Sequence, residues 1–201
     1  MPVQAPSENT DARERMITAG TDLIGQKGYH GCGLNEILKA AEVPKGSFYH
    51  YFKSKEDFGV AIVEDFTARY GLKLSQKLTD RRHLPLERLR RHFREAAGWY
   101  EEYGYGQTCL VAKLGMDVAG MSDDMREALD SGMAHWKAIF ARCLREAQSG
   151  GQIAASWDTD QLGSFLMDAW EGVAVQVQIS HDTQAIERLI DVIFNRMLVT
   201  G

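Results

Sequence analysis

The stretch that decides the fold runs from residue 34 to residue 56 and reads LNEILKAAEVPKGSFYHYFKSKE. Its first half carries four apolar side chains at the spacing i, i+3, i+4 and i+7 of a two-turn amphipathic helix; they are Leu34, Ile37, Leu38 and Ala41. Pro44 suits the first position of a new helix, because that position needs no backbone N–H. The pattern therefore predicts a helix over about residues 34–41, a tight turn, and a second helix over about residues 45–51.

The second of these helices has the composition of a helix that enters the major groove of DNA. Its outward side chains are polar or small, which permits contact with base edges; they are Lys45, Gly46, Ser47, Tyr49 and His50. Lys53 and Lys55 follow at the start of the next helix, whose N-terminal amides favour phosphate. Phe48 and Phe52 would anchor the second helix inward, although the same aromatic spacing also occurs in an ordinary core segment.

A helical pattern continues on both sides of these two short helices. Asn9 or Thr10 can cap a preceding helix that runs to about Lys27, and Ser54 can cap a following helix that runs to about Leu78. Further helices are expected to begin near five capping or helix-opening residues: Pro85, Thr108, Ser122, Asp158 and Asp182. No segment shows the alternating apolar and polar residues of a strand. The sequence therefore predicts an all-α fold.

The composition excludes several classes of protein. With 201 residues, of which 44% are hydrophobic and 25% charged, the sequence is that of an ordinary globular chain. No run approaches the ~20 apolar residues of a bilayer span, and the N-terminal residues lack the apolar core of a secretory signal. Cys32, Cys109 and Cys143 lie far apart, which favours a reducing compartment. We expect a cytoplasmic protein without a membrane segment, a metal site or a cofactor.

The charge of the chain is unevenly distributed. The formal net charge of −5 gives no global sign of nucleic-acid binding. Residues 1–56 contain seven Lys or Arg and seven Asp or Glu, so the rest of the chain carries the whole net charge. Within the first part, residues 44–55 contain three lysines and no acid. Such a stretch is usually a solvated face, so the neighbouring residues must decide its role.

Residues 37–56 closely resemble the DNA-binding end of the TetR family of transcriptional repressors, in which a helix reading like KGSFYHYF is followed by a K-x-(D/E) helix start. The resemblance implies a three-helix helix-turn-helix domain in residues 1–56 and a six-helix ligand-binding and dimerisation domain in residues 57–201. It implies that a homodimer binds double-stranded DNA at a palindromic operator, an inverted repeat, and that a small-molecule effector releases it. The DNA contacts that it implies are Lys45, Gly46, Ser47, Tyr49 and His50, with Lys55 on a phosphate. The chain departs from the family at the turn, where Glu42 replaces the Gly of many members.

The second domain is expected to contain a dimer seam and an effector pocket. The apolar stripes of the last two helices exceed what one small domain needs, and the resemblance makes them the seam, with an intramolecular core as the alternative. The seam residues are Leu162, Phe165, Leu166, Val173, Ile186, Leu189 and Ile193. Aromatic and Met side chains can line an adaptable apolar pocket, although any helical core contains them too. The pocket candidates are Trp99, Tyr103, Met116, Trp136 and Trp170.

Cys109 is a further effector candidate, because we expect it in the first turn of a helix. The helix dipole favours a thiolate there, and Lys113 lies four residues further on; an inert buried thiol is the alternative. Residues 108–115 and 170–172 resemble a TetR subgroup that responds to reactive electrophiles or small unsaturated acids, in which the equivalent cysteine can be the sensing thiol. Some members carry a lysine where this chain has Gln178. A noncovalent ligand is the competing hypothesis.

Two other classes of function compete with a repressor. A cytosolic thiol enzyme using Cys109 would need a positioned base and an orienting group. No histidine lies in the local motif, and no GxGxxG or GxxxxGK(S/T) loop occurs in the sequence. A helical adaptor without DNA binding would have no use for the intact segment from Lys45 to Lys55. We therefore predict a DNA-binding repressor that is not an enzyme.

Overall fold

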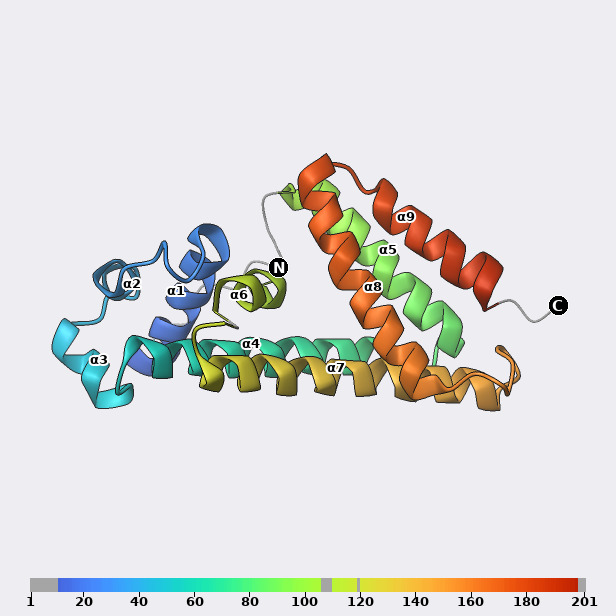
Figure 1. Cartoon of the computed structure of the whole chain (residues 1–201), viewed down its shortest axis with the longest axis horizontal. Helices are drawn as coiled ribbons and strands as arrows, with labels where there is room; N and C mark the ends of the chain where they lie inside the picture. The colour runs from blue at the N-terminus through green and yellow to red at the C-terminus, as the bar shows by residue number, and fades with distance from the viewer. Residues whose placement is uncertain (1–10, 106–109, 119, 199–201) are drawn as a thin grey trace. The chain divides into compact units, whose positions relative to one another are not determined.

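The computed structural model describes residues 11–105, 110–118 and 120–198, and every regular element in these ranges is helical. The elements, shown in Figure 1, are α1 (Ala12–Lys27), α2 (Leu34–Ala40), α3 (Lys45–Tyr51), α4 (Lys55–Leu78), α5 (Pro85–Tyr103), α6 (Leu110–Val118), α7 (Asp123–Ser149), α8 (Thr159–Ser180), α9 (Gln184–Ile190) and η1 (Asp191–Met197). The prediction of an all-α fold is confirmed. None of the described helices is long and apolar enough to cross a membrane.

Several helices begin where the sequence places their capping residues. The Ser54 hydroxyl accepts the N–H of Asp57 at 3.0 Å in the first turn of α4. The Ser122 hydroxyl accepts the N–H of Met125 at 3.2 Å at the start of α7. The Asp158 carboxylate accepts two amides of the first turn of α8, at 3.0 and 3.1 Å. These side chains satisfy N–H groups that have no partner within their own helix. Three other predicted caps lie outside the described residues: Asn9, Thr10 and Thr108.

The chain divides into two compact units, of which the first comprises residues 1–68 and 109–132. In this unit α1 packs against α2, α3 and α6, and Figure 1 shows α6 beside α1. Seven core side chains of the described residues in this unit have no exposed surface: Met16, Ile24, Ile37, Phe48, Phe58, Ile62 and Met125. Close approach of α4 and α7 depends on Gly132, because a Cβ there would lie 2.4 Å from Cγ2 of Thr67. The predicted domain boundary after residue 56 stays a prediction.

The turn between α2 and α3 is held by two backbone hydrogen bonds at the end of α2. The N–H of Val43 donates to the carbonyl of Leu38 at 3.0 Å, and the N–H of Glu42 donates to the carbonyl of Lys39 at 3.3 Å. This pairing is the Schellman motif, in which the residue after the helix is left-handed. Glu42 has a φ of 54°, so a residue with a side chain occupies a position that favours glycine.

The second unit comprises residues 69–108 and 133–201. Here α9 packs against both α8 and α5, and the three helices lie side by side in Figure 1. The ring of Phe93 lies near the centre of the core, 5.4 Å from the Trp170 ring and 6.0 Å from the rings of Phe140 and Phe194. After Ile190 the last helix widens into the π-helix η1, in which the N–H of Leu198 donates to the carbonyl of Ile193 at 3.0 Å. The sequence pattern predicts an ordinary helix there, so this part of the prediction is corrected.

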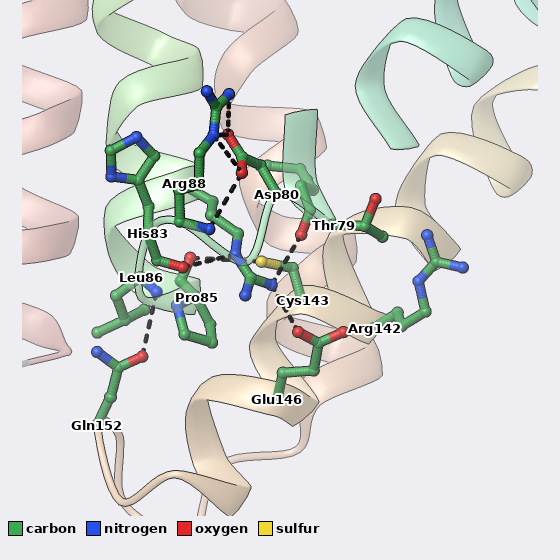
Figure 2. Close-up of polar contacts among 12 residues, drawn as sticks. Thr79, Asp80, His83, Pro85, Leu86, Arg88, Arg142, Cys143, Glu146 and Gln152 are labelled. Carbon is green, nitrogen blue, oxygen red and sulfur yellow. Dashed lines mark hydrogen bonds and ion pairs between the residues drawn. The ribbon is translucent and has the colours of Figure 1, made fainter. Parts of the chain in front are cut away.

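A buried arginine closes one end of the second unit, where α4 ends and α5 begins (Figure 2). Arg88 donates to the carbonyl of His83 at 2.8 Å, to the carbonyl of Leu78 at 3.1 Å and to the Glu146 carboxylate at 2.6 Å. Cys143 lies in the same cluster, where its thiol donates to the Pro85 carbonyl at 3.3 Å. Burial raises the pKa of Cys143 to about 12, so this thiol stays protonated at neutral pH.

Replacing Arg88 by leucine should destabilise the protein, because the buried carbonyl of Leu78 and the partly buried carbonyl of His83 would lose their donor. We expect Arg88→Leu to lower the free energy of unfolding by about 2–4 kcal/mol in urea titrations. Arg82→Ala is the matched control, because its side chain is 85% exposed and its pairing with Asp80 is screened by water. A value for Arg88→Leu within about 0.5 kcal/mol of the parent would contradict this role.

Candidate functional site

The helix α3 presents one face to the protein core and the other to solvent. Phe48 on α3 packs against Phe52 at 5.4 Å and against Phe58 of α4 at 5.6 Å, and the rings of Phe52 and Phe58 lie 4.9 Å apart. These three side chains are at most 3% exposed. The aromatic residues that sequence analysis places inward are therefore core residues, and they fix the orientation of α3.

The opposite face of α3 carries the five predicted base-reading residues. Lys45, Gly46, Tyr49 and His50 are exposed, and Ser47 is half-buried. Tyr49 is 61% exposed although it is aromatic, so its ring is available to another molecule. Apart from the backbone of its own helix and its two neighbours, no atom of the described residues lies within 4 Å of where a Cβ on Gly46 would be, so tertiary packing does not require glycine there. The side chains of this face are polar or, at Gly46, absent, which permits contact with base edges in the major groove.

Lys55 differs from the other candidates because its ammonium group points back to the protein. It donates to the carbonyl of Tyr29 at 2.9 Å and to the carbonyl of Cys32 at 2.6 Å, and it lies 4.5 Å from the centre of the Tyr29 ring. An ammonium group has three N–H donors, so one remains for a phosphate. The phosphate contact stays a prediction, and the structure adds that Lys55 holds the connector between α1 and α2.

The start of α4 is a rigid N-terminus next to α3. The Ser54 hydroxyl accepts the N–H of Asp57, and the Asp57 carboxylate accepts the N–H of Lys53 at 2.8 Å, one residue before the N–H that a capping box would use. Lys53 itself is exposed. A second exposed lysine therefore accompanies Lys45 on this part of the surface.

The predicted effector residues fall in different environments. Trp136 and Trp170 are buried in the core of the second unit, at 1% and 7% exposure, whereas Tyr103 at the end of α5 is 49% exposed. Trp99 is half-buried, and its indole N–H makes no hydrogen bond within the described residues. Met116 belongs to the first unit and is 85% exposed. Cys109 lies outside the described residues, so its predicted place in the first turn of a helix stays a prediction.

His92 on α5 is a buried polar residue that sequence analysis did not select. Its Nε2 lies 3.4 Å from the Tyr70 hydroxyl, and its Nδ1 makes no hydrogen bond within the described residues. The rings of Phe140 and Trp170 lie 5.8 and 6.4 Å away. Burial lowers the pKa of His92 to about 4, so the imidazole is neutral at neutral pH. The sequence signal that could have indicated its burial is its position next to Phe93, on the apolar stripe of α5.

A shallow groove of about 360 Å³ runs between α8 and the last helix. Its lining is almost entirely apolar: Phe165, Ala169, Gly172, Val173, Gln176, Ala185, Arg188, Leu189, Val192 and Ile193. Four of the seven predicted seam residues belong to it: Phe165, Val173, Leu189 and Ile193. The other three, Leu162, Leu166 and Ile186, are at most 3% exposed and pack inside the single chain. Val192, which is 52% exposed, is a groove residue that the sequence pattern did not single out.

The arrangement of α2, the turn, and the outward polar face of α3 defines a helix-turn-helix protein of the DNA-binding class. A family model described as bacterial regulatory proteins, tetR family, matches residues 16–62. A second, described as tetracyclin repressor-like, C-terminal domain, matches residues 85–193. The chain therefore belongs to the TetR family, whose members are ligand-responsive DNA-binding repressors.

Individual relatives agree with this assignment over nearly the whole chain. The transcriptional regulator AcuR of Cereibacter sphaeroides is 39% identical over 84% of this chain and 77% of its own length. The HTH-type transcriptional repressor NemR of Escherichia coli strain K12 is 34% identical over 90% of each chain. The crystal structure of the reduced form of E. coli NemR superimposes with a TM-score of 0.88, at 33% identity, covering 95% of this chain and 98% of that one.

Replacing Tyr49 by alanine should weaken binding to operator DNA by about tenfold or more, because one base-edge contact is worth about 1–3 kcal/mol. The variant should stay folded, because the side chain is 61% exposed and meets the core through an edge contact with the Phe48 ring at 5.3 Å. Binding should be measured over a series of salt concentrations. An unchanged affinity for the operator would remove this face of α3 from the interface.

Lys55→Ala should behave differently, because the Tyr29 and Cys32 carbonyls lose their donor. We expect a lower melting temperature together with weaker operator binding. The same salt series tests the phosphate contact, since losing one such contact lowers the salt slope by about one unit. An unchanged slope would show that Lys55 acts only on the connector.

Proposed function

We propose that the chain binds an inverted-repeat operator as a homodimer, with α3 of each copy in a major groove, and releases it when a small-molecule effector acts on the part of the chain that follows the helix-turn-helix. The observation that carries the proposal is the exposed polar face of α3, held rigid by the cluster of Phe48, Phe52 and Phe58. Two-fold symmetry of a dimer requires a two-fold symmetric DNA site. Members of the family bind operator DNA as homodimers and respond to small-molecule effectors.

The groove between α8 and the last helix supports the dimer proposal. Phe165 and Val192 are about half exposed and both line the same apolar groove, and a contiguous exposed apolar surface is typical of an interaction site. Leu166 and Ile186, which adjoin groove residues in the sequence, have no exposed surface and belong to the core of the single chain. A second copy packed on this face would remove both exposed side chains from water. We therefore propose that the dimer seam consists of the residues that line the groove, Val192 among them.

A charge placed in this groove should prevent dimerisation, because it would lose its hydration without gaining a partner. We expect Phe165→Asp and Val192→Asp to sediment as monomers and to bind the operator at least about tenfold more weakly, which corresponds to about 1.4 kcal/mol. Leu72→Asp is the matched control: Leu72 is 61% exposed on α4 but does not line the groove. Stable, DNA-binding dimers from both groove variants would place the interface elsewhere.

For the effector response we propose reaction of an electrophile with Cys109, as the resemblance of residues 108–115 implies. The two other cysteines support this assignment by their surroundings. Cys32 and Cys143 are both 1% exposed, and burial is the main cause that raises the pKa of each thiol. Because only the thiolate is a good nucleophile, both are poor targets. The ammonium of Lys113 donates to two carbonyls of α1, so two of its three N–H groups are used within the chain.

An electrophile such as N-ethylmaleimide should release operator DNA from the parent protein but not from Cys109→Ser. Cys32→Ser and Cys143→Ser should respond like the parent, because their thiols are buried. Operator binding with and without the electrophile should be paired with intact-protein mass, which counts the adducts. Release of DNA from treated Cys109→Ser would refute the thiol response. A noncovalent ligand would then be the better hypothesis. The observation that favours it is the buried Nδ1 of His92, which has no hydrogen bond within the described residues and lies among aromatic rings.

A further inference from the structure

The connector between α1 and α2 is bound by α6, a helix far away in the sequence. The Asp117 carboxylate accepts the N–H of Tyr29 at 3.0 Å, and the Asp117 carbonyl lies 3.2 Å from Nε2 of His30. Gly28 has a φ of 78°, and a Cβ there would lie 2.7 Å from the Asp117 carboxylate. The backbone of the connector and the side chain of Asp117 are therefore fitted closely to each other.

Lys113, a second side chain of α6, binds the C-terminal end of α1. The ammonium of Lys113 donates to the carbonyl of Gly25 at 2.9 Å and to the carbonyl of Gln26 at 3.0 Å. The last carbonyls of a helix have no partner within the helix and carry the negative end of its dipole. The ammonium group supplies these carbonyls with hydrogen-bond donors, and its positive charge stabilises the negative end of the helix dipole. Lys113 therefore fixes the point where α1 ends and the connector begins.

Ser122, which follows α6 in the sequence, contacts the start of α4 in the same compact unit. The Ser122 hydroxyl donates to the carboxylate of Glu56 in the first turn of α4. Next to Glu56, Lys55 holds the Tyr29 and Cys32 carbonyls from the side of α4. The connector is thus held by α4 through Lys55 and by α6 through Asp117. All of these residues belong to the first compact unit.

We propose that Lys113, Asp117 and Ser122, which we call the clasp, are positioning residues for operator recognition. The connector leads directly into α2, and α2 and α3 pack against each other and against α1. The clasp therefore sets where α3 stands on α1, although it contains no residue of the DNA-reading face. The proposal rests on the proposed function in one respect, because it assumes that α3 reads operator DNA.

Substitutions in the clasp can remove a charge while keeping a hydrogen bond, or remove both. Asp117 acts as an acceptor for the Tyr29 N–H, so Asp117→Asn keeps an oxygen in place, whereas Asp117→Ala removes it. Lys113→Met keeps the length of the side chain and removes its donors. Asp130→Ala is the matched control, because Asp130 is an exposed acid on α7 in the same unit.

The test compares specific and non-specific DNA affinity of the full chain. The specific probe is a duplex selected from random sequence by the parent protein, and the non-specific probe is the same duplex with its sequence scrambled. We expect Asp117→Ala and Lys113→Met to lose about tenfold or more in specific affinity. Non-specific affinity and its salt slope should stay unchanged, because the exposed lysines near α3 are untouched. Asp117→Asn and Asp130→Ala should bind like the parent.

Hydrogen exchange gives a second, independent measurement. The amide of Tyr29 should exchange faster in Asp117→Ala than in the parent, and circular dichroism should show that the variant remains folded. The proposal is overturned if both clasp variants keep parental specific affinity, or if specific and non-specific affinity fall in parallel. A parent that selects no duplex would refute the proposed function, and Tyr29 exchange alone would then decide on the clasp: an unchanged rate overturns it.

Discussion

The packing of Phe48 and Phe52 against Phe58 is the contact on which the DNA-binding face depends. α3 spans only Lys45–Tyr51, and helices this short are not stable alone in water. Its helical conformation must therefore come from tertiary packing, and the three rings supply it with centroid distances of 4.9–5.6 Å. Because one face is fixed in this way, the polar face has a single orientation.

Much of this arrangement could be predicted from the sequence, since it follows from local patterns. Apolar spacing and capping residues such as Ser54, Ser122 and Asp158 determine where helices begin, and the structure places the helices accordingly. Glu42 shows the limit of such reasoning. The sequence locates a turn there, but only the structure shows that Glu42 adopts the left-handed conformation within a Schellman motif. That choice depends on how α2 and α3 pack.

Contacts between distant parts of the chain could not be predicted. An apolar stripe indicates that a helix face is buried, but it does not show which surface covers that face. Leu166 is buried inside the chain and Phe165 lines the groove, yet both belong to the same apolar pattern in the sequence. Lysines raise the same difficulty, because exposure is their usual state. Lys55 and Lys113 instead bind backbone carbonyls 23 to 88 residues away. The π-helix after Ile190 likewise has no marker in the apolar pattern.

These lysine contacts change how DNA binding should be understood. Lys27 pairs with Glu36, and Lys55 and Lys113 bind backbone carbonyls, whereas Lys39, Lys45 and Lys53 are exposed on or next to α2 and α3. Non-specific affinity grows with the number of phosphates neutralised, and it does not depend on the base sequence. The exposed lysines can therefore hold the protein on any duplex, but they cannot distinguish the operator. That distinction depends on the fit of α3 to its base sequence, and a small displacement of α3 would remove the fit while the attraction to phosphates remained.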